Sequence, residues 1–472
     1  MAVAAGSGIV FDLQTARTEG IPGSGNNGRA RVGRFAAAGS GVSFDTPSFI
    51  AQTSRGAVPH LSGDNLRDHT DVRVVCVALE DFVEKCHPNV PVYNHPSTLR
   101  NFISHPSNSL LVLAPRRSPP VTTATSNTDA SIAILTSVGF RILKVDDYFN
   151  AVSNLRPDIA ISPPDLPHQK PGKTRRPKMV SRTELWLGEL IKRNTPNTPI
   201  FAPILPLDIE QQQSYYLDYL KEHISSLSGL ALYDARLAID MPDDLKGLPR
   251  LSLDEALTPH KVLQQVSWGV DVLNPAFLTR MTDSGISLKF QFPGETAGEK
   301  EALGVDLWNK EYGASLEPLA MGCKCYACRK HHRAYVQHLL VAKEMTAWVL
   351  LQIHNAKMVS NFFAAIRESI TRGTFEEDCK TFAEAYAEEF PEKTGHGPRC
   401  HSPSLNPQKA LLTGNRLRGY QFKSEGGVKK KNPKAFNKLG GDRRETLEEL
   451  ETPPDIDTKV LERGRFVEIS SG

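Results

Sequence analysis

Three cysteines and one later histidine are the residues of this chain whose types and spacing could do chemistry. Cys323, Cys325 and Cys328 fall within six residues, although the 472-residue chain has only seven cysteines. Thiolates are soft ligands, and three thiolates completed by an imidazole suit tetrahedral zinc. We interpret His354 as the source of that imidazole. The sequence therefore predicts one zinc ion held by Cys323, Cys325, Cys328 and His354.

The distance to the fourth ligand constrains the structure around the metal. His331 and His332 lie closer in sequence, but a helix beginning near them would carry their side chains away from the metal. His354 lies 26 residues after Cys328, and a straight helix of that length is about 39 Å long. His354 can close the site only if the segment is a helical hairpin that turns near 341–344. Four protein ligands would fill the coordination shell, so we expect structural rather than catalytic zinc.

Composition narrows the class of protein. A hydrophobic content of 40% supports a sizeable core, and the length suits one large barrel with additions. No apolar run approaches the roughly 18–20 residues that span a bilayer, and the N-terminal residues lack the basic start of a secretory signal. Seven scattered cysteines favour a reducing compartment over a disulfide framework. We therefore expect a cytoplasmic protein, and the net charge of +3 alone indicates no nucleic-acid binding.

The elements that must position these residues follow an alternating pattern. Apolar runs at 110–114, 158–162, 199–205 and 230–233 are typical of buried strands. Amphipathic segments lie between such runs, with helices expected at about 182–192 and 209–227, and Thr258-Pro259 marks another helix start. Strands and helices alternating at this spacing indicate a parallel sheet. With about eight such units, we predict an α/β fold, a closed TIM (β/α)8 barrel rather than an open sheet.

Four regions are expected along the chain. They are an N-terminal extension (1–27), the barrel (28–315), a zinc-binding helical insertion with closing helices (316–372), and a C-terminal helix with a charged extension (373–472). Within the extension, residues 414–444 hold ten Lys and Arg against two acidic residues. Residues 445–457 then hold six acidic residues and no basic one. This charge pattern predicts a tail that is partly disordered or loosely docked.

Two basic stretches raise the question of RNA binding. The Pro- and Lys/Arg-rich segment 163–182 predicts a solvated loop, with an RNA-facing surface as the alternative. Near the cysteines, four basic residues either contact RNA phosphates or form the solvated face of the hairpin. These four candidates are Arg329, Lys330, Arg333 and Lys343.

The cysteine motif also carries a resemblance to a known family. Cys323-x-Cys325-x2-Cys328-x25-His354 resembles the zinc subdomain of the tRNA-guanine transglycosylases. Three shorter pieces resemble family elements in the same order, namely Gly28–Gly33, Thr46-Pro47-x-Phe49 and Gly269-Val270-Asp271. The resemblance covers roughly residues 8–370, and it implies a TIM barrel that acts on tRNA.

The same resemblance implies altered chemistry in this chain. In the family, one aspartate attacks the ribose anomeric carbon and a second carboxylate assists proton transfer. Asn274 stands at the position of the nucleophile, and Thr136 is the best match to the second carboxylate. Asp271 lies three residues before Asn274 and should point to the opposite face of the strand. Asp165 resembles the aspartate with which the family reads the base.

The implied function is therefore that of a non-catalytic, accessory family member with no catalytic residues of its own. Such a protein pairs with a catalytic paralogue as a heterodimer, and the pair exchanges guanine for queuine at the wobble position of certain tRNAs. The resemblance also implies a peripheral association with the mitochondrial outer membrane. Two alternatives remain open from the sequence. One is an active transglycosylase, or another barrel enzyme, with a relocated nucleophile; the other is an RNA-binding scaffold unrelated to base exchange.

Overall fold

A computed structural model describes most of the chain before residue 399. The described residues are 8–14, 30–83, 90–121, 123, 126–136, 139–166, 171–194, 198–209, 214–295 and 298–398. The charged extension that we expected to be partly disordered lies outside them. None of the helices within these ranges is long and apolar enough to cross a bilayer.

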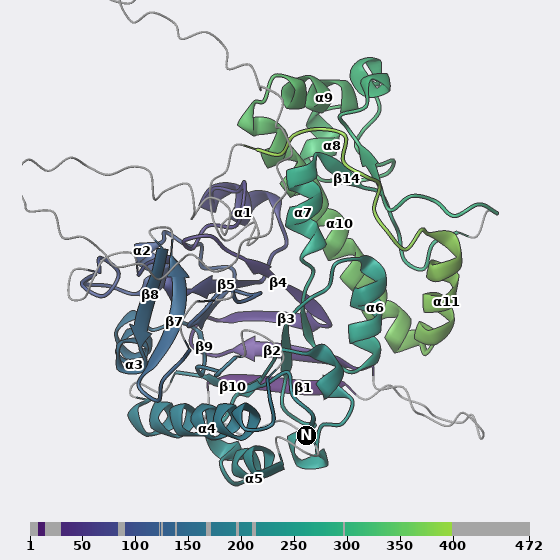
Figure 1. Ribbon diagram of the computed structural model, residues 1–472. Coiled ribbons are helices and arrows are strands. Elements are labelled where there is room, and N and C mark those ends of the chain that lie inside the picture. The colour runs from purple at the N-terminus through teal and green to yellow at the C-terminus, as the bar shows by residue number, and fades with distance from the viewer. Residues whose placement is uncertain are drawn as a thin grey trace, which may run out of the picture. The chain divides into compact units, whose positions relative to one another are not determined.

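Eight parallel strands close into a barrel, as the sequence predicts (Figure 1). The strands are β4 (Ser48–Gln52), β5 (Val74–Ala78), β6 (Leu110–Ala114), β9 (Ile159–Ile161), β10 (Ile200–Ile204), β11 (Gly229–Leu232), β12 (Arg250–Glu255) and β13 (Val272–Asn274). They pair in chain order, and β13 closes the barrel by pairing with β4. Both faces of these strands are covered, which explains their nearly continuous apolar sequences.

Helices and short 3-10 turns connect these strands. The helices are α1 (Gly63–His69), α2 (Leu99–Phe102), α3 (Val145–Leu155), α4 (Arg175–Arg193), α5 (Ser214–Glu222), α6 (Pro259–Ser267) and α7 (Phe277–Ser284). The 3-10 turns are η1 (Leu79–Asp81), η3 (Ile224–Ser226), η4 (Ala235–Ala238) and η5 (Asp243–Leu245). Thr258 caps α6 by accepting a hydrogen bond from the Lys261 N–H, with Pro259 in the first turn, as expected from the sequence.

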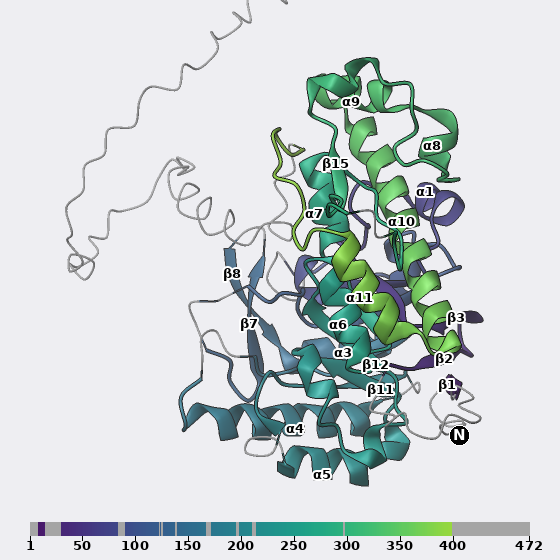
Figure 2. The ribbon, with the colours of Figure 1, turned by 90° about the vertical axis from the view of Figure 1, so that its right-hand side faces the viewer.

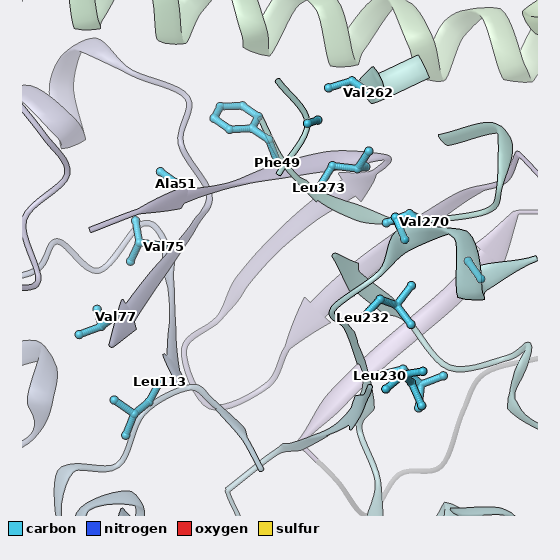
Figure 3. Packing of buried hydrophobic residues seen from close by; sticks show 14 of the residues in the cluster. Phe49, Ala51, Val75, Val77, Leu113, Leu230, Leu232, Val262, Val270 and Leu273 are labelled. Carbon is cyan, nitrogen blue, oxygen red and sulfur yellow. The ribbon is translucent and has the colours of Figure 1, made fainter. Parts of the chain in front are cut away.

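Two apolar clusters lie on opposite faces of the barrel wall. Val75 and Val77 belong to the outer cluster, between strands and helices (Figure 3). Val74 and Cys76 alternate with them along β5 and belong to the inner cluster. The side-chain alternation of a strand therefore assigns neighbouring residues to separate cores.

A small antiparallel sheet precedes the barrel. It comprises β1 (Ile9–Gln14), β2 (Val32–Ala37) and β3 (Val42–Thr46), in that order. Phe11, Phe35 and Phe44 from this sheet join the inner cluster. Since β3 leads directly into β4, the sheet covers the end of the barrel at which the strands begin. Part of the expected N-terminal extension is thus a strand that contributes to the core.

A β-hairpin is inserted between β6 and β9. Its strands, β7 (Ser131–Thr136) and β8 (Gly139–Lys144), pair antiparallel with each other and not with the barrel. The sequence shows apolar residues at 132–135 and 140–143, within these two strands. It does not reveal that they form a separate hairpin, because a buried hairpin strand and a barrel strand share the same apolar composition.

The segment expected to be a basic loop is partly helical. Helix α4 begins at Arg175 rather than near Arg182, so the expectation for 163–182 is wrong over its last eight residues. Pro177 is tolerated because it lies in the first turn, where its missing N–H has no intrahelical acceptor. The helix expected at 209–227 ends earlier than predicted, since α5 ends at Glu222 and the 3-10 turn η3 follows, whereas residues 210–213 lie outside the described chain.

The last part of the described chain forms the zinc-subdomain region and the closing helices (Figure 2). Its elements are β14 (Ile286–Leu288), β15 (Gly304–Asp306), η6 (Lys310–Ala314), α8 (Tyr326–Lys330), α9 (Arg333–Val341), α10 (Met345–Arg372) and α11 (Phe375–Ala385). Helices α9 and α10 form the predicted hairpin, and its turn lies at 342–344. Phe363 of α10 stacks on Phe49 of β4 with ring centroids 5.6 Å apart, so α10 joins this region to the barrel.

A buried histidine between α2 and β6 makes the stability of this fold pH-dependent. Burial, and the nearby positive charge of Arg100, lower the pKa of His105 to about 4. The unfolded state therefore binds a proton more readily than the folded state. Stability from neutral His105 is complete above about pH 6.5 and is lost as the pH falls towards 4, by up to about 3 kcal/mol.

We expect the His105→Gln variant to lose less stability than the wild type between pH 7 and pH 4.5. Urea unfolding at several pH values measures both slopes. The Ser109 hydroxyl, 2.7 Å from His105 Nε2, can pair with either side chain. Equal pH slopes for the two proteins would show that His105 is not the group responsible.

Candidate metal centre and barrel mouth

The four residues predicted to bind zinc lie together. The Sγ atoms of Cys323, Cys325 and Cys328 are 3.7, 3.6 and 3.3 Å from His354 Nδ1. All four ligand atoms lie within 4.8 Å of one another. Around tetrahedral zinc, bonds of about 2.3 Å to sulfur and 2.0–2.1 Å to nitrogen place S and N about 3.6 Å apart. The cluster therefore has the donor set and the dimensions to hold one metal ion such as zinc.

Local backbone structure presents the cysteines to one point. Cys325 is the N-cap of α8, and its Sγ accepts a hydrogen bond from the Cys328 N–H at 3.3 Å. Gly322, with φ of 74°, provides the left-handed turn that leads into Cys323. Hydrogen bonds from Cys325 and Cys328 hold the pKa of the Cys323 thiol well below its usual range. The same hydrogen bonds and burial raise the pKa of Cys325, so Cys323 is the cysteine of this pair favoured as a thiolate, the form that binds metals.

His354 is oriented by a partner outside the cluster. It is fully buried on α10, and its Nε2 lies 3.0 Å from the carbonyl oxygen of Leu288. A proton on Nε2 donated to that carbonyl leaves the Nδ1 lone pair directed at the three sulfurs, the usual arrangement for a metal-binding histidine. When bound, zinc would crosslink α8 to α10 and supply no reactive position.

The neighbouring Asn355 connects the same helix to the strand that orients His354. Its Oδ1 accepts a hydrogen bond from the Leu288 N–H at 2.9 Å. Its Nδ2 donates to the Ile286 carbonyl at 3.0 Å and to the Thr282 hydroxyl at 2.9 Å. Asn355 is fully buried, so these bonds replace those it would form with water. The metal cluster is therefore held to β14 and α7 as well as to its own hairpin.

The four basic RNA-contact candidates divide into two groups. Arg333 pairs with Glu317 at 2.6 Å and lies over the Tyr312 ring, with its side chain only 12% exposed. Arg329, Lys330 and Lys343 are exposed, and their side chains form no ion pair with any described residue. The structure thus leaves three of the four charges accessible, while Arg333 is engaged within the subdomain.

Asn274 and Thr136, at positions that the resemblance assigns to carboxylates, are both buried. Asn274 ends β13, at the carboxyl end where TIM barrels carry their active sites. Its Nδ2 has no hydrogen-bond partner among the described residues. Thr136 ends β7, and its hydroxyl donates to the Gly139 carbonyl at 2.9 Å. Neither side chain carries a negative charge.

Asp271 directly precedes β13, at the end of the barrel where the strands begin and away from Asn274. Its carboxylate is fully buried and accepts hydrogen bonds from Arg31 at 2.8 and 2.5 Å. It also accepts the Arg250 N–H at 2.7 Å. Asp271 therefore connects the N-terminal segment to the amino ends of the strands and is not available at the mouth.

Asp165, the candidate for base reading, is bound by protein side chains. It is fully buried, and its Oδ1 lies 2.7 Å from Arg175 and 2.8 Å from the Asn127 amide. Its Oδ2 pairs with Arg182. Both arginines come from α4, so Asp165 anchors the first turns of that helix after strand β9.

A buried charged cluster at the mouth was not predicted from the sequence. Glu80 follows β5, and Arg117, which follows β6, pairs with it at 2.8 Å and with Asp81 at 2.9 Å. Arg116 lies 3.7 Å from the other Glu80 oxygen. All four side chains are at most 7% exposed. One signal in the sequence could have predicted the cluster. Two acidic residues follow the first of two neighbouring barrel strands, β5, and two arginines follow the second, β6.

Two further carboxylates at the mouth were also missed. Asp254 and Glu255 end β12, and burial raises the pKa of each carboxyl group. Glu255 pairs with Arg280 at 2.8 Å. Asp254 accepts the Ala235 N–H at 3.3 Å, and no ion pair joins it to a described residue. Among the mouth carboxylates, Asp254 is thus the one without a paired cation in the described part of the chain.

Comparison with known proteins agrees with this architecture. The family model described as queuine tRNA-ribosyltransferase matches residues 26–388. A protein of Schizosaccharomyces pombe named queuine tRNA-ribosyltransferase accessory subunit 2 is 36% identical over 365 residues, covering 75% of this chain and 81% of that protein. Proteins with the same name from Anopheles gambiae and Drosophila grimshawi are 24% and 25% identical, covering 71% and 74% of this chain and 83% and 86% of their own lengths. This chain belongs to the queuine tRNA-ribosyltransferase family.

Proposed function

We propose that this chain is a non-catalytic subunit that supports the exchange of guanine for queuine at the wobble position of tRNA. It would act by pairing with a catalytic paralogue as a heterodimer. The three relatives described above are each named as an accessory subunit, which supports this role.

The observation that carries the proposal is Asn274 at the carboxyl end of β13. A carboxamide is neutral and a much weaker nucleophile than the carboxylate that covalent base exchange requires. The metal cluster, by contrast, retains all four ligands in a geometry that fits zinc. A protein that keeps its structural centre but not its nucleophile is suited to support chemistry performed elsewhere.

The rival function, an active enzyme with a relocated nucleophile, needs a free carboxylate at the mouth. Asp271 is bound by Arg31 at the other end of its strand, and Asp165 is bound by two arginines. Asp254 is the remaining candidate because no cation pairs with it in the described chain. If this chain alone exchanged the base, Asp254 would be the first residue to replace.

We assign the pairing surface to the zinc subdomain. Exposed apolar side chains concentrate between residues 316 and 345, namely Leu316, Met321, Tyr335, Val341 and Met345. They surround a buried core that includes Trp348 and the metal ligand Cys325. Apolar side chains exposed on a rigid support are typical of protein–protein contacts. A bound zinc ion would supply that rigidity, so its role here is structural.

The remaining assignments concern RNA and location. Arg329, Lys330 and Lys343 are proposed to contact tRNA phosphates, because their charges are exposed beside the metal cluster. Arg333 would act indirectly by fixing Glu317. We propose a cytoplasmic protein that associates peripherally with the mitochondrial outer membrane through surface contacts.

An exchange assay with labelled guanine and a tRNA transcript tests this function. We expect no exchange by this chain alone and full exchange once the catalytic paralogue is added. Replacing Asn274 by alanine should leave the rate of the pair within about twofold, because a side chain that does not react contributes little to the barrier.

Exchange by this chain alone, abolished by Asp254→Asn, would establish the rival function. A pair whose rate falls a hundredfold on Asn274→Ala would likewise contradict a supporting role. Metal content and elution volume of the variant serve as controls for folding and pairing.

A further inference from the structure

The ring of His354 is oriented by strand β14 and not by its own helix. A carbonyl oxygen can only accept a hydrogen bond, so the 3.0 Å contact with the Leu288 carbonyl places a proton on His354 Nε2. The Nδ1 lone pair then faces the three cysteine sulfurs, at 3.7, 3.6 and 3.3 Å. The direction of that lone pair therefore depends on where β14 holds one carbonyl group.

Strand β14 packs against α10 along one of its edges (Figure 1). Its other edge pairs with β15, and the Lys289 N–H continues that pairing by donating to the Leu303 carbonyl at 3.0 Å. Antiparallel strands alternate between residues that bond the partner strand and residues that face away from it. The backbone groups of residues 286 and 288 consequently face away from β15, where no other described strand continues the sheet.

The carboxamide of Asn355 takes the place of a third strand on that edge. Its Oδ1 accepts a hydrogen bond from the Leu288 N–H at 2.9 Å, and its Nδ2 donates to the Ile286 carbonyl at 3.0 Å. A residue of a parallel strand bonds its neighbour in the same way, accepting from one N–H and donating to the carbonyl two residues earlier. Asn355 therefore fixes both outward-facing residues of β14 from the helix that carries His354.

No solvent competes for these bonds, because His354, Leu288 and Asn355 are fully buried. The Thr282 hydroxyl, also buried, accepts a further bond from Asn355 Nδ2 at 2.9 Å. A buried amide that loses its partners is costly, so this arrangement resists displacement. Two consecutive residues of α10 thus hold one residue of β14, His354 at its carbonyl and Asn355 at its N–H.

We propose that Asn355 is a positioning residue for the metal ion, to which it contributes no ligand atom. It holds the Leu288 carbonyl in place and thereby keeps His354 Nδ1 directed at the cysteine sulfurs. Replacing the hydrogen-bond partner of a metal-binding histidine weakens metal binding by about ten- to hundredfold, and Asn355 acts on that partner directly. The inference goes beyond the proposed function, because it requires neither tRNA nor a catalytic paralogue.

Asn355→Leu in the full-length chain tests the positioning role, because leucine has the same branched shape and forms no hydrogen bond. Equilibrium competition with a chromophoric chelator measures the zinc affinity, and the absorption spectrum of the Co²⁺-substituted protein reports the ligand geometry. We expect zinc binding to weaken by about tenfold or more and the cobalt bands to change in position and intensity. Amide hydrogen exchange in β14 should become faster, since the Leu288 N–H loses its acceptor.

Thr282→Val is the matched control within the network. Valine keeps the shape of threonine and removes the outer acceptor of Asn355 Nδ2, but both bonds from Asn355 to β14 remain. We expect a zinc affinity within about twofold of the wild type and an unchanged cobalt spectrum, because no bond to the partner of His354 is lost. Asp165→Asn, which removes a buried ion pair of the barrel, controls for lower stability alone and should bind zinc as the wild type does.

Wild-type zinc affinity and cobalt spectrum in Asn355→Leu would overturn the positioning role. An equal loss of affinity in Thr282→Val or Asp165→Asn would also overturn it, because the loss would then reflect lower stability. If Asn355→Leu does not fold, Asn355→Ser replaces it, since serine is too short to bond both residues of β14. The same weakening is expected for that variant, and unchanged zinc binding by it would equally reject the proposal.

Discussion

Replacing Cys325 by serine is expected to remove the bound metal and to lower the free energy of unfolding by about 3 kcal/mol or more. A serine hydroxyl is a poor ligand for zinc, and three remaining ligands form an open site. Cys325 also caps α8 through its Sγ, and serine can accept the same hydrogen bond from the Cys328 N–H, so the loss reports the metal rather than the helix cap. Metal analysis of the purified protein and thermal unfolding measure the two effects.

Cys379→Ser is the matched control. Cys379 is a free, partly exposed cysteine on α11, outside the metal cluster. It should retain the full metal content and unfold within about 1 kcal/mol of the wild type. A Cys325→Ser protein with one metal ion per chain would contradict the assigned ligand set.

The Cys325→Ser variant also tests whether pairing with the catalytic paralogue requires the bound metal. Because the exposed apolar side chains of the subdomain lie over the core that contains Cys325, we expect pairing with the catalytic paralogue to fall in parallel with metal content. Normal pairing by a metal-free protein would show that the pairing surface does not depend on zinc.

The metal ligands and the barrel were predictable because their signals are local or repeated. Three cysteines in six residues define a ligand set before any fold is known. The 26-residue separation of His354 from Cys328 then requires a return of the chain, and α9 and α10 supply it with a turn at 342–344. The barrel follows from the repetition of strand and helix.

The charges at the barrel mouth could not be predicted in the same way. Glu80 and Arg117 lie 37 positions apart, and they meet only because β5 and β6 are neighbours whose carboxyl ends share one edge. A sequence pattern of period two or 3.6 carries no information about such a pair. The start of α4 at Arg175 was missed for a related reason, because the carboxylate that binds its first turn lies ten residues earlier.

Asp165→Asn is expected to destabilise the protein by about 3–5 kcal/mol, because removing one member of a buried ion pair leaves the other charges without compensation. Asp165 is fully buried, whereas the side chains of its partners Arg175 and Arg182 are 29% and 13% exposed. The amide of asparagine would also place an N–H donor against guanidinium donors. Urea unfolding at pH 7 measures the loss.

Asp129→Asn is the control, because Asp129 binds the same guanidinium of Arg182, at 2.8 Å, from a position that is 76% exposed. An exposed ion pair contributes little, so we expect a change below about 1 kcal/mol. The comparison also decides what Asp165 does. If Asp165 were kept to read a base, its replacement by asparagine would cost little stability and would abolish ligand binding. A carboxylate that anchors α4 should show the opposite, a large loss of stability and no queuine binding to lose, since both of its oxygens already bind arginines.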